Sequence, residues 1–188
     1  MNLNSKKPIY VLSECAIFVA MAIALSFIEI KVGASGGSID FTMVPLFIIC
    51  YRHGAKYSFL SCFVFSLLYV TIGGKWGYGP QSVLLDYILA YTLIGVAGFF
   101  GGKFKHKSKF TEVAVFTGCL ARFAIAVISG VVLYGITTAT EVGTTGFITS
   151  NSLIFSLVYN GLYMLPNTII AIVIMALLRY PLKKIEKM

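Results

Sequence analysis

Charged residues are scarce in this sequence. Asp, Glu, Lys and Arg make up 12% of the 188 residues, and only seven residues are acidic. A soluble domain of this size is about 25% charged and about 45–50% apolar, whereas 58% of this chain is hydrophobic. The composition therefore indicates an integral membrane protein and leaves no room for a separate soluble domain.

Several chemical signatures are also missing. There is no GxxxxGK[ST] loop, so any step driven by ATP requires a partner. No nucleophile–base pair, zinc-ligand set or phosphate loop is present, so we expect no catalytic residue, no metal and no cofactor. The cysteines lack CxxC spacing and lie in apolar segments, which favours buried thiols over metal ligands or disulfides; they are Cys15, Cys50, Cys62 and Cys119.

Long apolar runs predict an all-α membrane protein with six transmembrane helices in one integral membrane domain, residues 1–188. The helices are expected near residues 9–30, 40–51, 57–74, 82–102, 111–136 and 152–178. The second run is too short to cross the membrane as a full perpendicular span. The connections 31–39 and 137–150 are rich in small and polar residues and are predicted to be flexible loops.

The distribution of basic residues predicts the orientation. Lys31 and Lys75 lie on one side of the predicted bundle, and Arg122 lies within a span. Twelve basic residues lie on the other side: Lys6, Lys7, Arg52, Lys56, Lys103, Lys105, Lys107, Lys109, Arg179, Lys183, Lys184 and Lys187. Because cytoplasmic loops carry an excess of Lys and Arg, both termini are predicted to be cytoplasmic. The net charge of +8 is thus attributed to topology rather than to nucleic-acid binding.

The span 82–102 contains an aspartate, Asp86, near its outer end. A carboxylate beside hydrocarbon is costly unless it is hydrated, paired or protonated. Asp86 could be an interfacial carboxylate in water, with Trp76 and Tyr78 in an ordinary aromatic belt. Alternatively it accepts hydrogen bonds from a ligand that lies between aromatic rings. That second arrangement suits a cationic or amino-bearing heterocycle.

The last span carries a polar stripe. Ser156, Asn160, Tyr163 and Asn167 recur at spacings of four, three and four residues, which places them on one helix face. Lipid cannot satisfy an asparagine amide, so this face is expected to point inward. Hydrogen bonds between helices explain each residue taken singly, whereas a polar cavity better explains the whole stripe. Pro166 removes a helix hydrogen bond and allows a local kink.

Two further features each have two explanations. Arg122, near the cytoplasmic end of its span, is expected to extend its side chain to the membrane interface. The alternative for Arg122 is a counter-ion to an acidic side chain or a ligand oxygen. Ala16, Ala20 and Ala24 form a stripe of small residues, which either packs inside the bundle or faces a separate subunit.

Four segments resemble the thiamine-specific S components of energy-coupling factor transporters, the ThiT/YuaJ family. They follow the family's order over most of the chain: GGSIDFTMVPLFIICYRHGAKYSF (36–59), LLDYILAYTLIGVAGFF (84–100), RFAIAVISGVVLYG (122–135) and FSLVYNGLYMLPN (155–167). The resemblance implies the S-component bundle, in the plasma membrane of a bacterium. It also implies capture of thiamine outside the cell and association with a transmembrane scaffold subunit and two cytoplasmic ATPases.

The resemblance also implies roles for particular residues. The acidic ligand of the aminopyrimidine falls on Asp86, followed by Tyr87, and the amide of the last helix falls on Asn160. Trp76 and Tyr134 fall on aromatic positions that sandwich the rings, and Tyr163 completes the predicted substrate site. Contact with the scaffold subunit falls on the stripe Ala16, Ala20 and Ala24.

Two positions depart from the family pattern. Ala126 stands where the family has histidine, and Phe155 stands where it has tyrosine. Loss of two polar contacts costs about 1–3 kcal/mol, so thiamine is the leading ligand and its hydroxymethylpyrimidine precursor is the alternative. Two other classes are a solitary ion-coupled vitamin carrier and an assembly protein without a ligand. The missing inverted repeat and the outer position of Asp86 weaken the carrier hypothesis.

Overall fold

The computed structural model describes residues 8–32, 37–73, 79–101, 110–133, 135, 140–142 and 145–186. Five of its helical segments are long and apolar enough to cross a membrane. They are α1 (Pro8–Ser26), α3 (Ala55–Ile72), the composite segment Pro80–Phe100, α6 (Phe110–Leu133) and α7 (Ser152–Glu186). The predicted class, a multi-pass helical membrane protein, is confirmed.

The composite segment Pro80–Phe100 changes its helical winding along its length. It begins with α4 (Pro80–Ser82), continues as the π-helix η2 (Val83–Leu89) and the short α5 (Ala90–Thr92), and ends as the 3₁₀-helix η3 (Leu93–Phe100). Pro80 occupies the first helical turn, where its missing N–H costs no helix hydrogen bond. A π-helical turn widens the helix locally and is found frequently at functional sites; here it carries Asp86 and Tyr87.

The sixth helix, α2 (Met43–His53), forms the centre of the molecule. It is apolar but shorter than a membrane span, as predicted. All of its first nine residues are buried, from Met43 to Tyr51, because α1, α3, η3 and α7 all pack against it. It joins α3 directly through Gly54, whose φ of 74° is a conformation that glycine adopts without steric cost. The outer helices expose large apolar side chains instead, as lipid-facing helices do.

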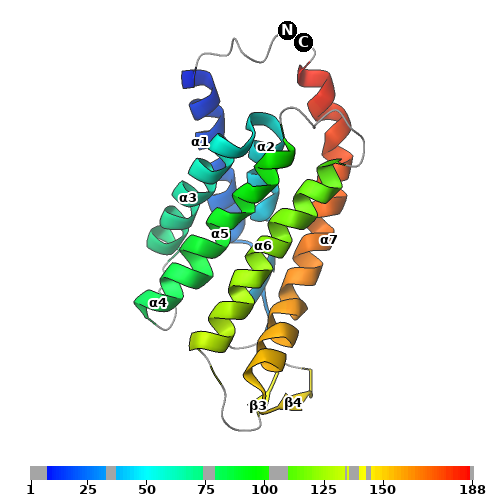
Figure 1. Cartoon of the computed structure of the whole chain (residues 1–188). Coiled ribbons are helices and arrows are strands. Elements are labelled where there is room, and N and C mark those ends of the chain that lie inside the picture. The colour runs from blue at the N-terminus through cyan, green and yellow to red at the C-terminus, as the bar shows by residue number, and fades with distance from the viewer. Residues whose placement is uncertain are drawn as a thin grey trace.

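The first residue of α1 and the last residues of α7 lie at the same end of the bundle, as Figure 1 shows. The opposite end holds α4 and the strands β3 (Thr140–Glu141) and β4 (Ile148–Thr149). At the end that holds the termini, Arg179 of α7 pairs with Glu112 of α6 at 2.9 Å. The cytoplasmic location of this end stays a prediction from the charge distribution.

The connections predicted to be flexible contain short antiparallel strand pairs. The chain leaves α1 at Ser26, before the predicted end at residue 30, and forms β1 (Glu29–Val32), which pairs with β2 (Gly37–Asp40). Thr140 likewise pairs with Thr149 in the second connection. The prediction of flexible loops is therefore wrong for these residues. Outside the helices, their backbone N–H and C=O groups form hydrogen bonds between paired strands. In addition, α7 continues past the predicted end at residue 178 to Glu186.

The four cysteines agree with the sequence-based interpretation. All of them are buried and none is in a disulfide. Among the described residues, no group of three or more His, Cys, Asp or Glu side chains could hold a metal ion. The cysteines therefore contribute to packing in the core.

Candidate ligand-binding site

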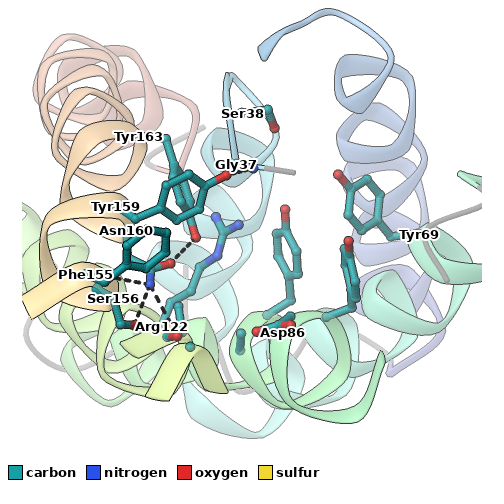
Figure 2. Close-up of a pocket in the computed structure, with 15 residues that line it drawn as sticks. Gly37, Ser38, Tyr69, Asp86, Arg122, Phe155, Ser156, Tyr159, Asn160 and Tyr163 are labelled. Atoms are coloured by element: carbon teal, nitrogen blue, oxygen red, sulfur yellow. Dashed lines mark hydrogen bonds between the residues drawn. The ribbon is translucent and has the colours of Figure 1, made fainter. Parts of the chain in front are cut away.

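A polar cavity lies between the composite helix, α6 and α7, in the half of the bundle away from the termini. Its volume is about 110 Å³, and it is partly open. The cavity is lined by Gly37, Ser38, Tyr69, Asp86, Tyr87, Ala90, Tyr91, Arg122, Ala126, Gly130, Phe155, Ser156, Tyr159, Asn160 and Tyr163. Figure 2 shows that Asp86 and Asn160 belong to different walls of this space.

Asp86 is placed by the π-helix η2 and is half-buried. Its Oδ2 accepts a hydrogen bond from the hydroxyl of Ser82, one turn earlier, at 2.7 Å. A carboxylate has several lone-pair positions and can accept more than one hydrogen bond. Tyr87, the next residue, also lines the cavity, and its ring lies 6.0 Å from that of Tyr69 on α3.

The polar stripe of α7 faces inward, as predicted. Asn160 is 6% exposed, and its amide nitrogen donates to the carbonyl oxygens of Ala126 and Ser156, at 3.3 and 2.8 Å. Its Oδ1 accepts from the hydroxyl of Tyr163 at 2.5 Å. Both explanations of the stripe therefore hold: the amide hydrogens bond α7 to α6 and to the preceding turn, while Asn160 and Tyr163 line the cavity.

A close approach of α6 to α7 makes these bonds possible. A Cβ added at Gly130 would overlap the hydroxyl of Ser156. That hydroxyl donates across the interface to the carbonyl oxygen of Val127 at 3.0 Å. Small residues at a helix–helix contact allow such hydrogen bonds inside a membrane. The small side chains of α6 thus determine where the polar residues of α7 lie.

The first hairpin is attached to α7 beside the cavity. The hydroxyl of Tyr159 accepts from the backbone N–H of Gly37 at 2.9 Å and donates to the carbonyl oxygen of Val32 at 3.2 Å. Gly37 and Ser38 contribute to the cavity wall. A Cβ at Gly37 would overlap the ring of Tyr163, so glycine is required by the close approach of β2 to α7. The strand β2 therefore forms part of the cavity wall.

Arg122 lies in the cavity wall and not at the membrane interface. It is 8% exposed, and its guanidinium carbon lies 4.0 Å from the centre of the Tyr91 ring. Its side chain points into the cavity (Figure 2), and Nη1 has no hydrogen-bond partner in the described part of the chain. The preferred prediction, extension to the interface, is wrong. Packing of α6 against α5 holds the side chain in the interior instead.

The structure brings together most of the predicted substrate-site residues. Asp86, Tyr87, Asn160 and Tyr163 line one cavity. Trp76 and Tyr134, predicted to stack on the ligand, lie outside the described residues. Sequence reasoning missed Tyr91 and Tyr159. Their spacing was available as a signal, since each lies four residues from another cavity-lining aromatic residue along its helix.

The positions that depart from the family pattern also line the cavity. Ala126 and Phe155 are both in its wall, and the ring of Phe155 stacks on that of Tyr159, with centroids 6.1 Å apart. Both positions that the resemblance marks as departures therefore lie in the cavity wall.

The alanine stripe of α1 lies on the outside of the bundle. Ala16, Ala20 and Ala24 are all exposed, whereas the buried side of α1 is formed by Val11, Cys15, Val19, Ala22 and Ser26. The alternative that the stripe packs inside the bundle is therefore wrong. An exposed row of small side chains allows another helix to approach closely in the membrane.

A membrane bundle with a polar cavity between its spans defines a ligand-binding membrane protein, and comparison with known proteins identifies its family. The family model described as thiamine transporter protein (Thia_YuaJ) matches residues 12–187, and the chain belongs to this family. It is therefore a transporter protein rather than an enzyme.

Individual relatives agree with this assignment. The thiamine transporter ThiT of Bacillus subtilis (strain 168) is 34% identical over 187 residues, which cover 94% of this chain and 93% of the relative. The thiamine transporter ThiT of Lacticaseibacillus paracasei is 27% identical, with coverage of 94% and 90%. A solved structure of ThiT from Listeria monocytogenes superimposes with a TM-score of 0.81 at 26% identity, covering 95% of this chain and 98% of that one.

Proposed function

We propose that this chain is the thiamine-binding S component of an energy-coupling factor importer. One observation carries the proposal: Asp86 and Asn160 line the same polar cavity between membrane spans, in a chain that belongs to a thiamine transporter family. Thiamine combines an aminopyrimidine, which has hydrogen-bond donors and acceptors, with a permanently charged thiazolium. A cavity with a carboxylate, amide and hydroxyl groups and several aromatic rings suits both parts of the molecule.

In this proposal Asp86 accepts a hydrogen bond from the exocyclic amino group of the pyrimidine. A carboxylate accepts hydrogen bonds and donates none, and its negative charge stabilises the cationic vitamin in a site of low dielectric constant. Asn160 orients the pyrimidine through Oδ1, which already accepts from Tyr163 and has a second lone pair. The unpartnered Nη1 of Arg122 is a donor for a ring nitrogen or an oxygen of the ligand.

Aromatic side chains supply the stacking surfaces. Tyr87 and the stacked pair Phe155 and Tyr159 line the cavity, and Trp76 and Tyr134 are proposed to complete the enclosure of the rings. A cation over an aromatic face gains roughly 0.5–2 kcal/mol. The thiazolium is therefore expected to lie against these rings and away from Arg122, whose charge would repel it.

The proposal includes partners. The exposed alanine stripe of α1 is the contact surface for a transmembrane scaffold subunit, because small residues allow close helix approach. Two cytoplasmic ATPases supply the energy for import, since this sequence has no nucleotide-binding loop. The whole chain then acts as one membrane domain that binds the vitamin outside the cell and releases it inside.

The test is the identity and energetics of the bound ligand. Mass spectrometry of small molecules that co-purify with the protein should detect thiamine. Purified Asp86→Asn should bind thiamine at least about 30-fold more weakly, because it loses a charge-assisted hydrogen bond. Glu141→Gln, which removes an exposed carboxylate on β3, should bind like the unsubstituted protein. Full affinity in Asp86→Asn, or binding that requires Na⁺ or a proton gradient, would contradict the proposal.

The departures at Ala126 and Phe155 favour a direct comparison of two ligands. Titration with thiamine and with hydroxymethylpyrimidine measures how much of the affinity comes from the thiazolium half. We expect thiamine to bind at least about tenfold more tightly, since burial of a second ring removes more apolar area from water. Equal affinity for the two compounds would assign the site to the pyrimidine alone.

A further inference from the structure

The cavity contains a buried cation that is supported by an aromatic ring. Arg122 of α6 and Tyr91 of α5 are 8% and 2% exposed. The guanidinium carbon lies 4.0 Å from the centre of the Tyr91 ring. No salt bridge to Arg122 is found among the residues that the structure describes. A desolvated guanidinium over a ring face is attracted by the negative charge density of that face.

The ring of Tyr91 is itself held in place. It packs edge-to-face against Phe65 and Tyr69, with centroid distances of 5.0 and 5.2 Å. Both partners belong to α3 and are buried, Phe65 completely and Tyr69 at 4% exposure. Aromatic edge-to-face packing restricts the orientation of a ring. Two spans, the composite segment and α3, therefore fix the surface on which the guanidinium of α6 lies.

We infer that Tyr91 is a positioning residue for ligand binding, because its ring face holds the guanidinium of Arg122 in the wall of the cavity. This inference rests on the proposed function of the cavity. A carboxylate partner would occupy the guanidinium hydrogens with bidentate hydrogen bonds. An aromatic face stabilises the charge without using those hydrogens. The arrangement thus leaves the Arg122 donors available to an acceptor atom of the ligand.

The inference is tested by a double-mutant cycle on thiamine affinity, measured by titration calorimetry of the full-length protein. Tyr91→Phe keeps the ring face and should stay within about threefold of the unsubstituted protein. Tyr91→Leu removes the face but keeps apolar volume, and it should weaken binding about tenfold or more. In an Arg122→Gln background, Tyr91→Leu should have little further effect, since residues that act through one another are not additive.

A purely structural role for Tyr91 would give different results. Tyr91→Leu would then weaken binding equally in both backgrounds, and that outcome would overturn the inference. Equal damage from Tyr91→Phe and Tyr91→Leu would also overturn it, because it would assign the effect to the hydroxyl. Phe65→Leu serves as the matched control, since Phe65 contacts the Tyr91 ring and belongs to the same aromatic cluster. Phe65→Leu should weaken thiamine binding less than Tyr91→Leu does.

A second measurement separates this inference from the proposed function. The unsubstituted protein, the two single variants Tyr91→Leu and Arg122→Gln, and the double variant are also melted without ligand. Tyr91→Leu should lower the melting temperature by at least roughly 3 °C less in the Arg122→Gln background than in the unsubstituted protein. Absence of thiamine binding by the unsubstituted protein would refute the proposed function. The ligand-free coupling would still decide whether the Tyr91 ring holds Arg122, and equal losses in both backgrounds would show that it does not.

Discussion

The side-chain amide of Asn167 is hydrogen-bonded to the backbone of Asp40, which lies 127 residues earlier in the chain. Oδ1 of Asn167 accepts from the backbone N–H of Asp40 at 2.9 Å, and its Nδ2 donates to the carbonyl oxygen of Ser38 at 2.8 Å. The Asn167 side chain thus makes with β2 one donated and one accepted hydrogen bond, as the backbone of a neighbouring strand would. Together with Tyr159, it places the hairpin against the wall of the cavity.

Replacement of Asn167 should therefore destabilise the protein. Asn167→Leu leaves the buried N–H of Asp40 and the partly buried carbonyl of Ser38 without this partner, which costs about 1–3 kcal/mol for the buried group and less for the other. The melting temperature of the purified protein should fall by roughly 5–10 °C. Thr168→Val is the control, because the Thr168 hydroxyl donates within its own helix, to the carbonyl oxygen of Met164 one turn earlier. An Asn167→Leu protein that melts like the control would contradict this role.

Gly130 and Gly161 provide a matched pair of helical glycines. A Cβ at Gly130 would overlap the Ser156 hydroxyl, whereas a Cβ at Gly161 meets nothing within 4 Å. Gly130→Ala should separate α6 from α7 and weaken both stability and thiamine binding, by about 1–3 kcal/mol in stability. Gly161→Ala should raise stability by about 0.5–1 kcal/mol, because alanine favours the helix. Thermal melting of both proteins measures the contrast, and equal effects would refute the close approach.

The hydroxyl of Tyr159 should control how long a ligand stays bound. It bridges Gly37 and Val32, so Tyr159→Phe releases both contacts while the ring remains in the cavity wall. We expect dissociation of thiamine to accelerate by roughly 5–30-fold, since two hydrogen bonds are worth about 1–2 kcal/mol, with a small change in association rate. Stopped-flow binding measures both rates. Tyr180→Phe, at an exposed tyrosine of α7, should change neither.

The exposed alanine stripe should be needed for assembly but not for ligand capture. Ala20→Leu adds bulk where a scaffold helix would approach and should abolish most association with the scaffold subunit in a pull-down experiment. Thiamine affinity of the isolated protein should stay unchanged, because α1 does not line the cavity. Ala124→Leu makes the same change at an exposed position of α6. If both variants assemble normally, the scaffold contacts another surface.

The sequence carried the signals for the class of fold and for part of the site. Hydropathy over about 20 residues is a local property, so the sequence located the spans, although α7 extends eight residues beyond its predicted end. The spacing of Ser156, Asn160, Tyr163 and Asn167 indicated one inward helix face, because the period of a helix is fixed. Asp86 stood out because an acidic residue in a span is rare and costly.

Tertiary packing decided the rest. The sequence favoured extension of Arg122 to the membrane interface, whereas in the folded protein its guanidinium lies over the Tyr91 ring of a different helix. Asn160 and Asn167 look alike in the sequence, yet one bonds α6 and the other bonds a strand. The outward direction of Ala16, Ala20 and Ala24 depended on which side of α1 meets α2 and α3. Local sequence determines which residues share a face, whereas contacts between distant segments determine what that face meets.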